Sequence, residues 1–213
     1  MQVALEVCRR VCAGGLLLGA APGCGNGVVE PIVADAPGAG GVSELAGTAT
    51  DDAASDASSS ASQGAGVEYC ADVREWLDAD SAAEDGMLSL LNAARRWGLS
   101  CTGPEIGEPL SALTPEPELE CAARVHARDM FERGYFSHTN PEGEGPAQRF
   151  GKAGAAFVLV GEVIGDSRAG ASLFEETIRA GGADCSLLLS ASFDAVGVGY
   201  YQGLWTIALA SSP

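Results

Sequence analysis

The segment from Pro117 to Arg149 constrains the fold more than any other stretch of this sequence. Apolar residues and one histidine recur there at intervals of three and four, the spacing that places side chains on one helical face (Leu119, Ala122, Ala123, His126 and Met130). Pro117 suits the first position of a helix, and Gly134 suits its C-terminal end. The chain then runs Tyr-Phe-Ser-His-Thr, which predicts a strand that leaves the core and ends at a cleft. His138 is therefore the first candidate for a functional residue.

The N-terminus, residues 1–23, has the layout of a secretory signal peptide. Two arginines precede an apolar run from Val11 to Ala21 that is too short to span a bilayer. The run ends in Ala-Pro-Gly-Cys, which resembles a bacterial lipobox with Cys24 as the acylated cysteine. We expect export with Cys24 lipidated, and the alternative is an ordinary signal peptide that is cleaved nearby. The expected location is the cell envelope, as an outer-membrane lipoprotein, or the extracellular space.

Composition divides the rest of the chain into a tether and one domain. Residues 24–67 are rich in Gly, Ala, Ser and Asp, and all their charges are acidic. Such a segment cannot bury enough apolar surface to offset its ordering entropy, so we expect a disordered tether. Residues 68–213 have the size of one domain, which we expect to be monomeric. A net charge of −17 with few, dispersed basic residues argues against a nucleic-acid partner, and the lipid anchor is the expected membrane contact.

The predicted domain contains an even number of cysteines, which fits an oxidising compartment (Cys70, Cys101, Cys121 and Cys185). None of them belongs to a CxxC pair, so a zinc ribbon is disfavoured. Four cysteines allow three pairings, among which a sequence alone does not choose. We expect Cys101–Cys121, which would pin the loop between two helices, and Cys70–Cys185, which would tie the start of the domain to its far end.

Periodicity in the remaining sequence predicts helices first and paired strands last. The expected elements are helices over 81–97 and 172–180, a short helix at 148–150, a β-prone run at 157–160 that leads to Glu162, and a hairpin of 195–201 with 204–209. This order predicts an α+β fold with a small, mostly antiparallel sheet.

The two histidines leave few catalytic options. His126 lies on the apolar helix face, where a buried histidine is typically a hydrogen-bonded core residue. The sequence has no GxSxG and no HExxH motif, and its Gly-x-Gly at 197–199 follows no helix start, so it forms no phosphate cradle. One histidine with carboxylates, as in His138, Glu162 and Asp184, can still hold a divalent metal weakly. We expect no other cofactor.

Four blocks, in order, resemble the CAP (SCP-like) superfamily of cysteine-rich secretory, antigen 5 and pathogenesis-related proteins, and its exported bacterial branch in particular. They are LNAARRWGL, PELECAARVHARDMFERGYFSHTNPEGEGPAQRF, GEVIG and ADCSLLLSASFDAVGVGYY with LWTIALA. The resemblance covers about Met87 to Ala210. It implies a three-layer α-β-α sandwich with a cleft of two histidines and two acids, which binds a divalent metal in some members. Family roles range from lipid binding to signalling, with no universal reaction.

The resemblance assigns His138 to the first family histidine and Glu162 to the acid of the GEN motif. This chain departs from the family at Val163, which replaces the GEN asparagine, and at Asp184, which replaces the second histidine. The second family acid has no clear match. We place Asn140 in the same cleft as a binding residue.

These assignments predict a non-catalytic cleft around His138 and Glu162, altered at Asp184, with weak or absent zinc affinity. The expected partner is a lipid, a small molecule or a component of the envelope. One alternative is a metal-assisted or general-base hydrolase in which Glu162 orients His138 as the base. Another is a purely structural surface protein.

Overall fold

The structure is a computed structural model that describes residues 28–30, 66, 68–101, 103 and 106–213. The expected signal peptide, Cys24 and most of the expected tether therefore lie outside the described residues. The described helices are η1 (Ala71–Val73), α3 (Asp78–Arg96), α4 (Pro117–Arg133), α5 (Pro146–Ala153), α6 (Gly170–Ala180) and α7 (Gly182–Leu188). The described strands are β1 (Val28–Glu30), β2 (Thr114–Pro115), β3 (Leu159–Asp166), β4 (Ala195–Tyr201) and β5 (Leu204–Ser211).

The strands form one sheet in the order β1-β3-β5-β4-β2. The pairs β1–β3, β3–β5 and β5–β4 are antiparallel, and the short β2 pairs with β4 in parallel. The β4–β5 hairpin is confirmed, with its turn at Gln202 and Gly203, which both have positive φ. β1 lies within the stretch predicted as tether, and it pairs with β3 beside Glu162.

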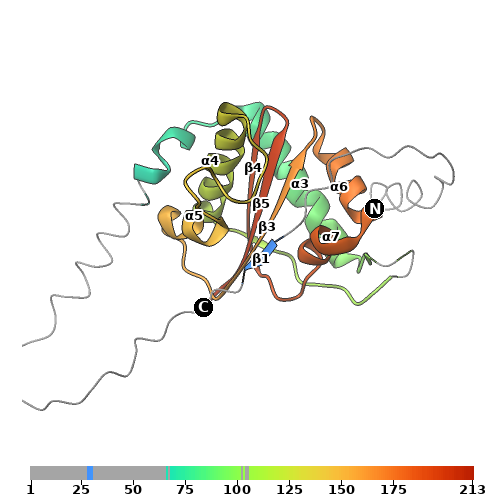
Figure 1. Cartoon of the computed structure of the whole chain (residues 1–213). Coiled ribbons are helices and arrows are strands. Elements are labelled where there is room, and N and C mark those ends of the chain that lie inside the picture. The colour runs from blue at the N-terminus through green and yellow to red at the C-terminus, as the bar shows by residue number, and fades with distance from the viewer. Residues whose placement is uncertain (1–27, 31–65, 67, 102, 104–105) are drawn as a thin grey trace, which may run out of the picture.

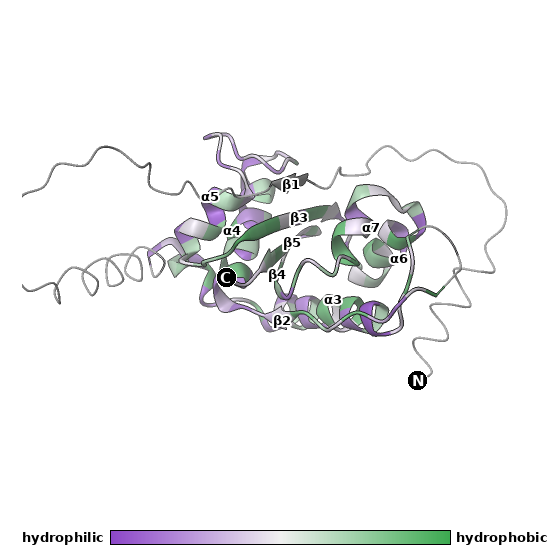
Figure 2. Cartoon of the chain, turned by 90° about the horizontal axis from the view of Figure 1, so that it is seen from below, coloured by the Kyte–Doolittle hydropathy of each residue, from purple (hydrophilic) through white to green (hydrophobic). Residues whose placement is uncertain are grey.

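Helices cover both faces of this sheet, so the α+β fold with three α-β-α layers is confirmed (Figure 1). α4 and α5 lie on one face, and α3, α6 and α7 lie on the other (Figure 1). The side chains of β5 alternate between the two layers: Trp205, Ile207 and Leu209 join the α3/α6/α7 core, whereas Ala208 and Ala210 join the α4/α5 core. Hydrophobic residues accordingly concentrate on the central strands β3 and β5 (Figure 2).

The predicted strand after α4 is wrong, because residues 135–139 form a loop. Gly134 ends the helix in the left-handed conformation, with φ 68°, and turns the chain back over α4. The Tyr135 amide then bonds to Met130 O, and Ser137 O accepts a hydrogen bond from His126. The two consecutive aromatic residues suggested a strand paired with the sheet, but this segment bonds to α4 instead.

The predicted disulfide pairing is also wrong, because the bridges are Cys70–Cys121 and Cys101–Cys185. Cys121 belongs to α4 and lies beside η1, on one face of the sheet. Cys101 follows α3 and packs with the core of the opposite face, where Cys185 is buried in α7. The sheet therefore separates the two cysteines that we expected to pair, although they are close in sequence.

Candidate functional site

The candidate site is built on α4, which lies unusually close to the sheet. Several strand positions beneath this helix carry glycine or alanine, including Gly197 and Gly199 in β4 and Ala208 in β5. A Cβ atom at Gly197 would lie 2.1 Å from the backbone carbon of Leu119, and one at Gly199 would lie 2.3 Å from that of Ala123. These glycines therefore allow helix and strand backbones to touch. The contact brings the buried face of α4, with His126, close to β3.

His126 is fully buried on α4, at the position that the helical spacing predicts. Its Nε2 lies 3.0 Å from Ser137 O, and its Nδ1 lies 3.4 Å from the hydroxyl of Tyr135, which in turn donates to Asp129. Burial lowers the pKa of His126 to about 4, although the nearby charge of Glu162 opposes this shift. The ring is therefore neutral at pH 7 and donates its Nε2 proton to Ser137 O, which holds the loop after α4 against the helix.

Glu162 lies at the centre of the site, in β3, with its side chain on the α4/α5 side of the sheet. The carboxylate is fully buried, and each of its oxygens has a charged or polar partner. Oε1 lies 2.8 Å from His138 Nδ1, and Oε2 accepts a hydrogen bond of 2.6 Å from Arg149. Oε1 also lies 3.9 Å from Nε2 of His126. Both histidines therefore lie within 4 Å of the same carboxylate oxygen.

Electrostatics keep this buried carboxylate ionised. Burial alone would raise the pKa of Glu162, but the hydrogen bond from His138 and the charge of Arg149 outweigh it and hold the pKa below its ordinary value. An ionised carboxylate only accepts hydrogen bonds, so the Nδ1 atom of His138 carries the proton. The His138 side chain, which is 13% exposed, is thereby fixed in orientation at the edge of the buried cluster.

Arg149 is a site residue to which no sequence motif assigns a role. Its side chain, 2% exposed, extends from α5 and binds three groups at once. Besides Glu162, it donates hydrogen bonds of 2.7 Å to His138 O and 2.8 Å to Glu144 O. Arg149 therefore holds both the carboxylate and the loop that carries His138. The only sequence signal was an arginine on a short helix that also carries the buried Phe150.

Tyr69 is the second residue that sequence reasoning missed. It packs against the α4/α5 core, and burial raises the pKa of its phenol. The charge of Arg149 opposes this shift, whereas the charges of Glu144, Asp129 and Glu162 add to it. The chain just before Cys70 therefore lies within the electrostatic field of the site. No spacing or motif around Tyr69 indicates this position.

The other two predicted cleft residues are Asn140 and Asp184. The Asn140 amide is engaged within its own loop, where Oδ1 accepts from the amides of Glu142 and Glu144 and Nδ2 donates to the Glu144 carboxylate. Asp184 lies on α7, in the layer across the sheet from Glu162 (Figure 1). The structure brings His138 and Glu162 together but does not bring Asp184 to them.

The divalent metal of some family members does not fit these residues. Within the described part of the chain, no group of three or more His, Cys, Asp or Glu side chains is placed to hold a metal ion. Both oxygens of Glu162 are already engaged by His138 and Arg149, and a bound cation would compete with the guanidinium. The His138, Glu162 and Asp184 set is therefore not assembled as a metal site.

A surface groove lies at the N-terminal end of α4. Its volume is about 540 Å³, and its lining includes Cys70, Arg74, Pro117 and Cys121. Neither His138 nor Glu162 lines it.

Among the described helices, none is both long and apolar enough to cross a membrane.

The fold and the site together describe a three-layer α-β-α domain with two disulfides and a buried His–Glu pair beside its sheet. The model of the cysteine-rich secretory protein family, CAP, matches residues 88–204, which is more than half of the chain. The chain therefore belongs to the CAP family. A search of curated proteins found no match.

Solved structures with the same fold include proteins from three bacteria. An extracellular protein with an SCP domain from Bacillus anthracis is 22% identical, with a TM-score of 0.55 over 62% of this chain and 41% of that one. An outer surface protein from Borrelia burgdorferi is 16% identical, with a TM-score of 0.53 over 62% of this chain and 94% of its own. A cysteine-rich secretory protein from Staphylococcus aureus is 11% identical, with a TM-score of 0.51 over 63% and 40%. This chain thus spans about two fifths of the Bacillus and Staphylococcus proteins. At such identities the likeness establishes the fold alone.

Proposed function

We propose that this protein is an exported CAP domain that binds a lipid, a small molecule or an envelope component through the surface around His138 and Glu162, without catalysing a reaction. The observation that carries the proposal is the state of Glu162: it is fully buried, and its two oxygens are taken by His138 and Arg149. A carboxylate in this state orients a neighbour rather than contacting a substrate. His138 is the member of the cluster that reaches the surface.

Native mass spectrometry of the mature protein, purified from its own host, tests this proposal. We expect the wild type to carry a bound species that His138→Ala loses and that the control Asp184→Asn retains, since Asp184 lies across the sheet. A wild type without any bound species, or a species that His138→Ala retains, would contradict a binding site at His138. Circular dichroism of each variant checks that the fold is intact.

We further propose that the domain is a monomer attached to the membrane by a lipid on Cys24. Export is supported by the two disulfide bonds and by membership of a secreted family. Labelled-palmitate incorporation in the host tests the anchor: the wild type is expected to incorporate the label and Cys24→Ser to lose it. A wild type that incorporates no label would remove the anchor.

A second candidate function is general-base hydrolysis. The 2.8 Å contact between Glu162 and His138 Nδ1 favours it, because a carboxylate that orients a histidine is the arrangement found in hydrolytic triads. We expect p-nitrophenyl esters and an unstructured peptide to be hydrolysed only at the background rate. A rate above background that both His138→Ala and Glu162→Gln abolish would establish the hydrolase and overturn the binding proposal.

A further inference from the structure

The two disulfides of this domain differ in what surrounds them. Cys101–Cys185 packs with the apolar core of the α3/α6/α7 layer, where Cys185 is fully buried. Cys70–Cys121 instead forms part of the wall of the 540 Å³ groove, and both of its cysteines line that groove. A disulfide can be cleaved by a thiol only if the attacking thiolate reaches one sulfur in line with the bond. The groove offers such access to the Cys70–Cys121 bridge.

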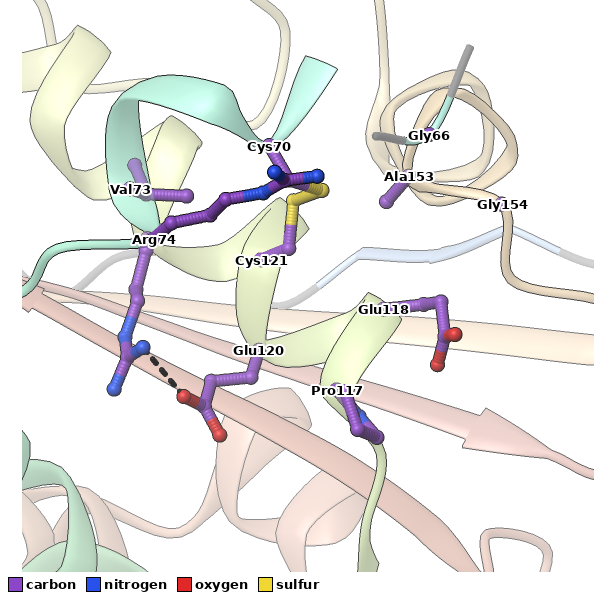
Figure 3. Close-up of a pocket in the computed structure, with 11 residues that line it drawn as sticks. Gly66, Cys70, Val73, Arg74, Pro117, Glu118, Glu120, Cys121, Ala153 and Gly154 are labelled. Atoms are coloured by element: carbon purple, nitrogen blue, oxygen red, sulfur yellow. Dashed lines mark ion pairs between the residues drawn. A yellow bond between two sulfur atoms is a disulfide. The ribbon is translucent and has the colours of Figure 1, made fainter. Parts of the chain in front are cut away.

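The groove at Cys70–Cys121 is bounded by η1, the first turns of α4 and the end of α5 (Figure 3). Its apolar lining includes Val73 and Ala153, beside the disulfide. A volume of about 540 Å³ lies within the range of pockets that accept small organic molecules. A low-molecular-weight thiol is small enough to enter it.

The charges around this groove favour a thiolate at the bridge. The side chain of Arg74 extends along the groove toward the disulfide (Figure 3). Arg124 also lines the groove and pairs there with Glu84 and Glu120. The remaining acid on the rim, Glu118, points away from the sulfur atoms (Figure 3). A nearby cation stabilises a thiolate, which makes a cysteine a better leaving group in thiol–disulfide exchange.

We propose that Cys70–Cys121 is a thiol-exchange site that takes small thiols and dithiols. A reductant thiolate attacks the sulfur of Cys70, the less buried of the pair, and forms a mixed disulfide while Cys121 leaves as a thiolate. A second reductant thiol then displaces Cys70. Two protein thiols are formed, and the two reductant thiols are oxidised to one disulfide. Atoms and electrons therefore balance with the thiol as the only co-reactant.

Cleavage of this bridge affects the His138–Glu162 cluster. Cys70 connects η1 to α4 and directly follows Tyr69, which packs against the core between α4 and α5, the two helices that carry His126 and Arg149. Without the bridge, Tyr69 and η1 keep only their noncovalent contacts with the α4/α5 core. Exchange at Cys70 thus loosens the packing of η1 and Tyr69 on the α4/α5 core, whereas Cys101–Cys185 continues to hold the opposite layer.

Graded reduction of the mature wild-type protein tests the proposal. The protein is incubated with glutathione or dithiothreitol, quenched with an alkylating reagent, and mapped by peptide mass spectrometry. We expect Cys70 and Cys121 to be labelled at least about tenfold faster than Cys101 and Cys185, with glutathione captured on Cys70. Equal labelling of both bridges, or faster labelling of Cys101–Cys185, would overturn the proposal.

Two sets of variants test its parts separately. Arg74→Gln is expected to slow the labelling of Cys70 and Cys121, and Arg74→Lys to keep the wild-type rate; equal rates in all three proteins would contradict the role of the cation.

In Cys70→Ser/Cys121→Ser, amide hydrogen exchange is expected to rise at Tyr69, η1 and the loop of residues 135–145, but not in α7. Cys101→Ser/Cys185→Ser is the matched control, with the rise in α7. A rise that spares Tyr69 and that loop would refute the link to the site.

Discussion

Each face of the sheet buries one arginine, but the two arginines have different partners. On the α4/α5 face, Arg149 donates to the Glu162 carboxylate and to two backbone carbonyls. On the α3/α7 face, Arg95 is equally buried, yet all four of its hydrogen bonds go to backbone carbonyls, those of Ser111, Leu188, Ser190 and Phe193. Arg95 therefore connects backbone segments to one another. Arg149 forms an ion pair with Glu162, which in turn binds His138.

The difference shows which buried charge belongs to a site. A guanidinium bound only to carbonyls satisfies the backbone and has no titratable partner. A guanidinium bound to a carboxylate sets the charge state of that carboxylate, which in turn orients a histidine. The layer with Asp184 therefore supports the fold, and the layer with His138 carries the candidate site. The predictions below test this division between the two layers.

The largest effects are expected from removing the two arginines. Arg149→Met leaves Glu162 buried without its counter-charge and should cost about 3–5 kcal/mol of unfolding free energy. Arg95→Met should cost a comparable amount, since it leaves four carbonyls without a donor. The two are distinguished by a second change: adding Glu162→Gln should restore part of the stability of Arg149→Met and none of that of Arg95→Met. Urea unfolding of the two single variants, the two double variants and the wild type gives these free energies.

The pH dependence of these two variants separates them further. In Arg149→Met the pKa of Glu162 should rise above its unfolded value, so protonation of the folded state relieves the cost as the pH falls. The deficit relative to the wild type should therefore shrink between pH 7.5 and about pH 5. The deficit of Arg95→Met should not. Deficits that respond identically to pH would contradict the assignment of Arg149 to a charged pair.

A second prediction concerns how closely the helices approach the sheet. Gly197→Ala places a Cβ atom 2.1 Å from the α4 backbone, which cannot move aside without lifting the helix, and should cost about 3 kcal/mol or more. Gly161→Ala is the matched control on the other face, because its Cβ would meet the Phe193 ring at 2.9 Å and the Leu187 side chain at 3.2 Å. Side chains can shift, so about 1 kcal/mol is expected there. Thermal or urea unfolding gives both values, and equal costs would refute the close backbone contact of α4.

The third prediction follows from the neutral, buried His126. Its pKa is about 4 in the folded protein against an ordinary value of 6.5, so the unfolded state binds the proton first as the pH falls. This contribution to stability is complete above pH 6.5 and is lost toward pH 4, by about 2–3 kcal/mol. In His126→Gln, the decline between pH 6.5 and 4.5 should be smaller by that amount. Urea unfolding across this range is the measurement, and an unchanged decline would show that His126 is not buried as the neutral form.

The smallest effect is expected at Asp184. Asp184→His restores the residue that the family pattern places there, but on the layer across the sheet from His138. Isothermal titration should find no gain in zinc affinity over the wild type. A gain of about tenfold or more that His138→Ala removes would mean that the two layers form one metal site.

The sequence predicts the α4 layer well because its signals are local. The spacing of apolar residues defines α4, Pro117 and Gly134 mark its ends, and alternation defines the β4–β5 hairpin. The family blocks identify His138 and Glu162, which the structure then places 2.8 Å apart. Nothing in the sequence identifies Arg149 or Tyr69, because their partners are distant in the chain and their contacts depend on the packing of α5 and η1 against α4.

The errors have the same physical origin. The expected Cys101–Cys121 pairing rests on a loop between two helices, but the sheet places these two cysteines on opposite faces. The strand at 135–139 was inferred from local aromatic residues, but Gly134 and Ser137 bind that segment to α4. The glycines at 197 and 199 were tested only as a phosphate cradle, whereas their role is to admit the α4 backbone. In each case a long-range contact outweighs a local preference.

The central claim is that Glu162 orients His138 while His126 is held by the backbone, so that the two rings carry their protons on opposite nitrogens. Nitrogen-15 NMR of the imidazoles, at a pH where both rings are neutral, reports this directly. The account predicts a proton on Nδ1 of His138 and on Nε2 of His126, with the His138 preference lost in Glu162→Ala and kept in Asp184→Asn. A His138 ring that is protonated on Nε2, or that keeps its preference without Glu162, would contradict it.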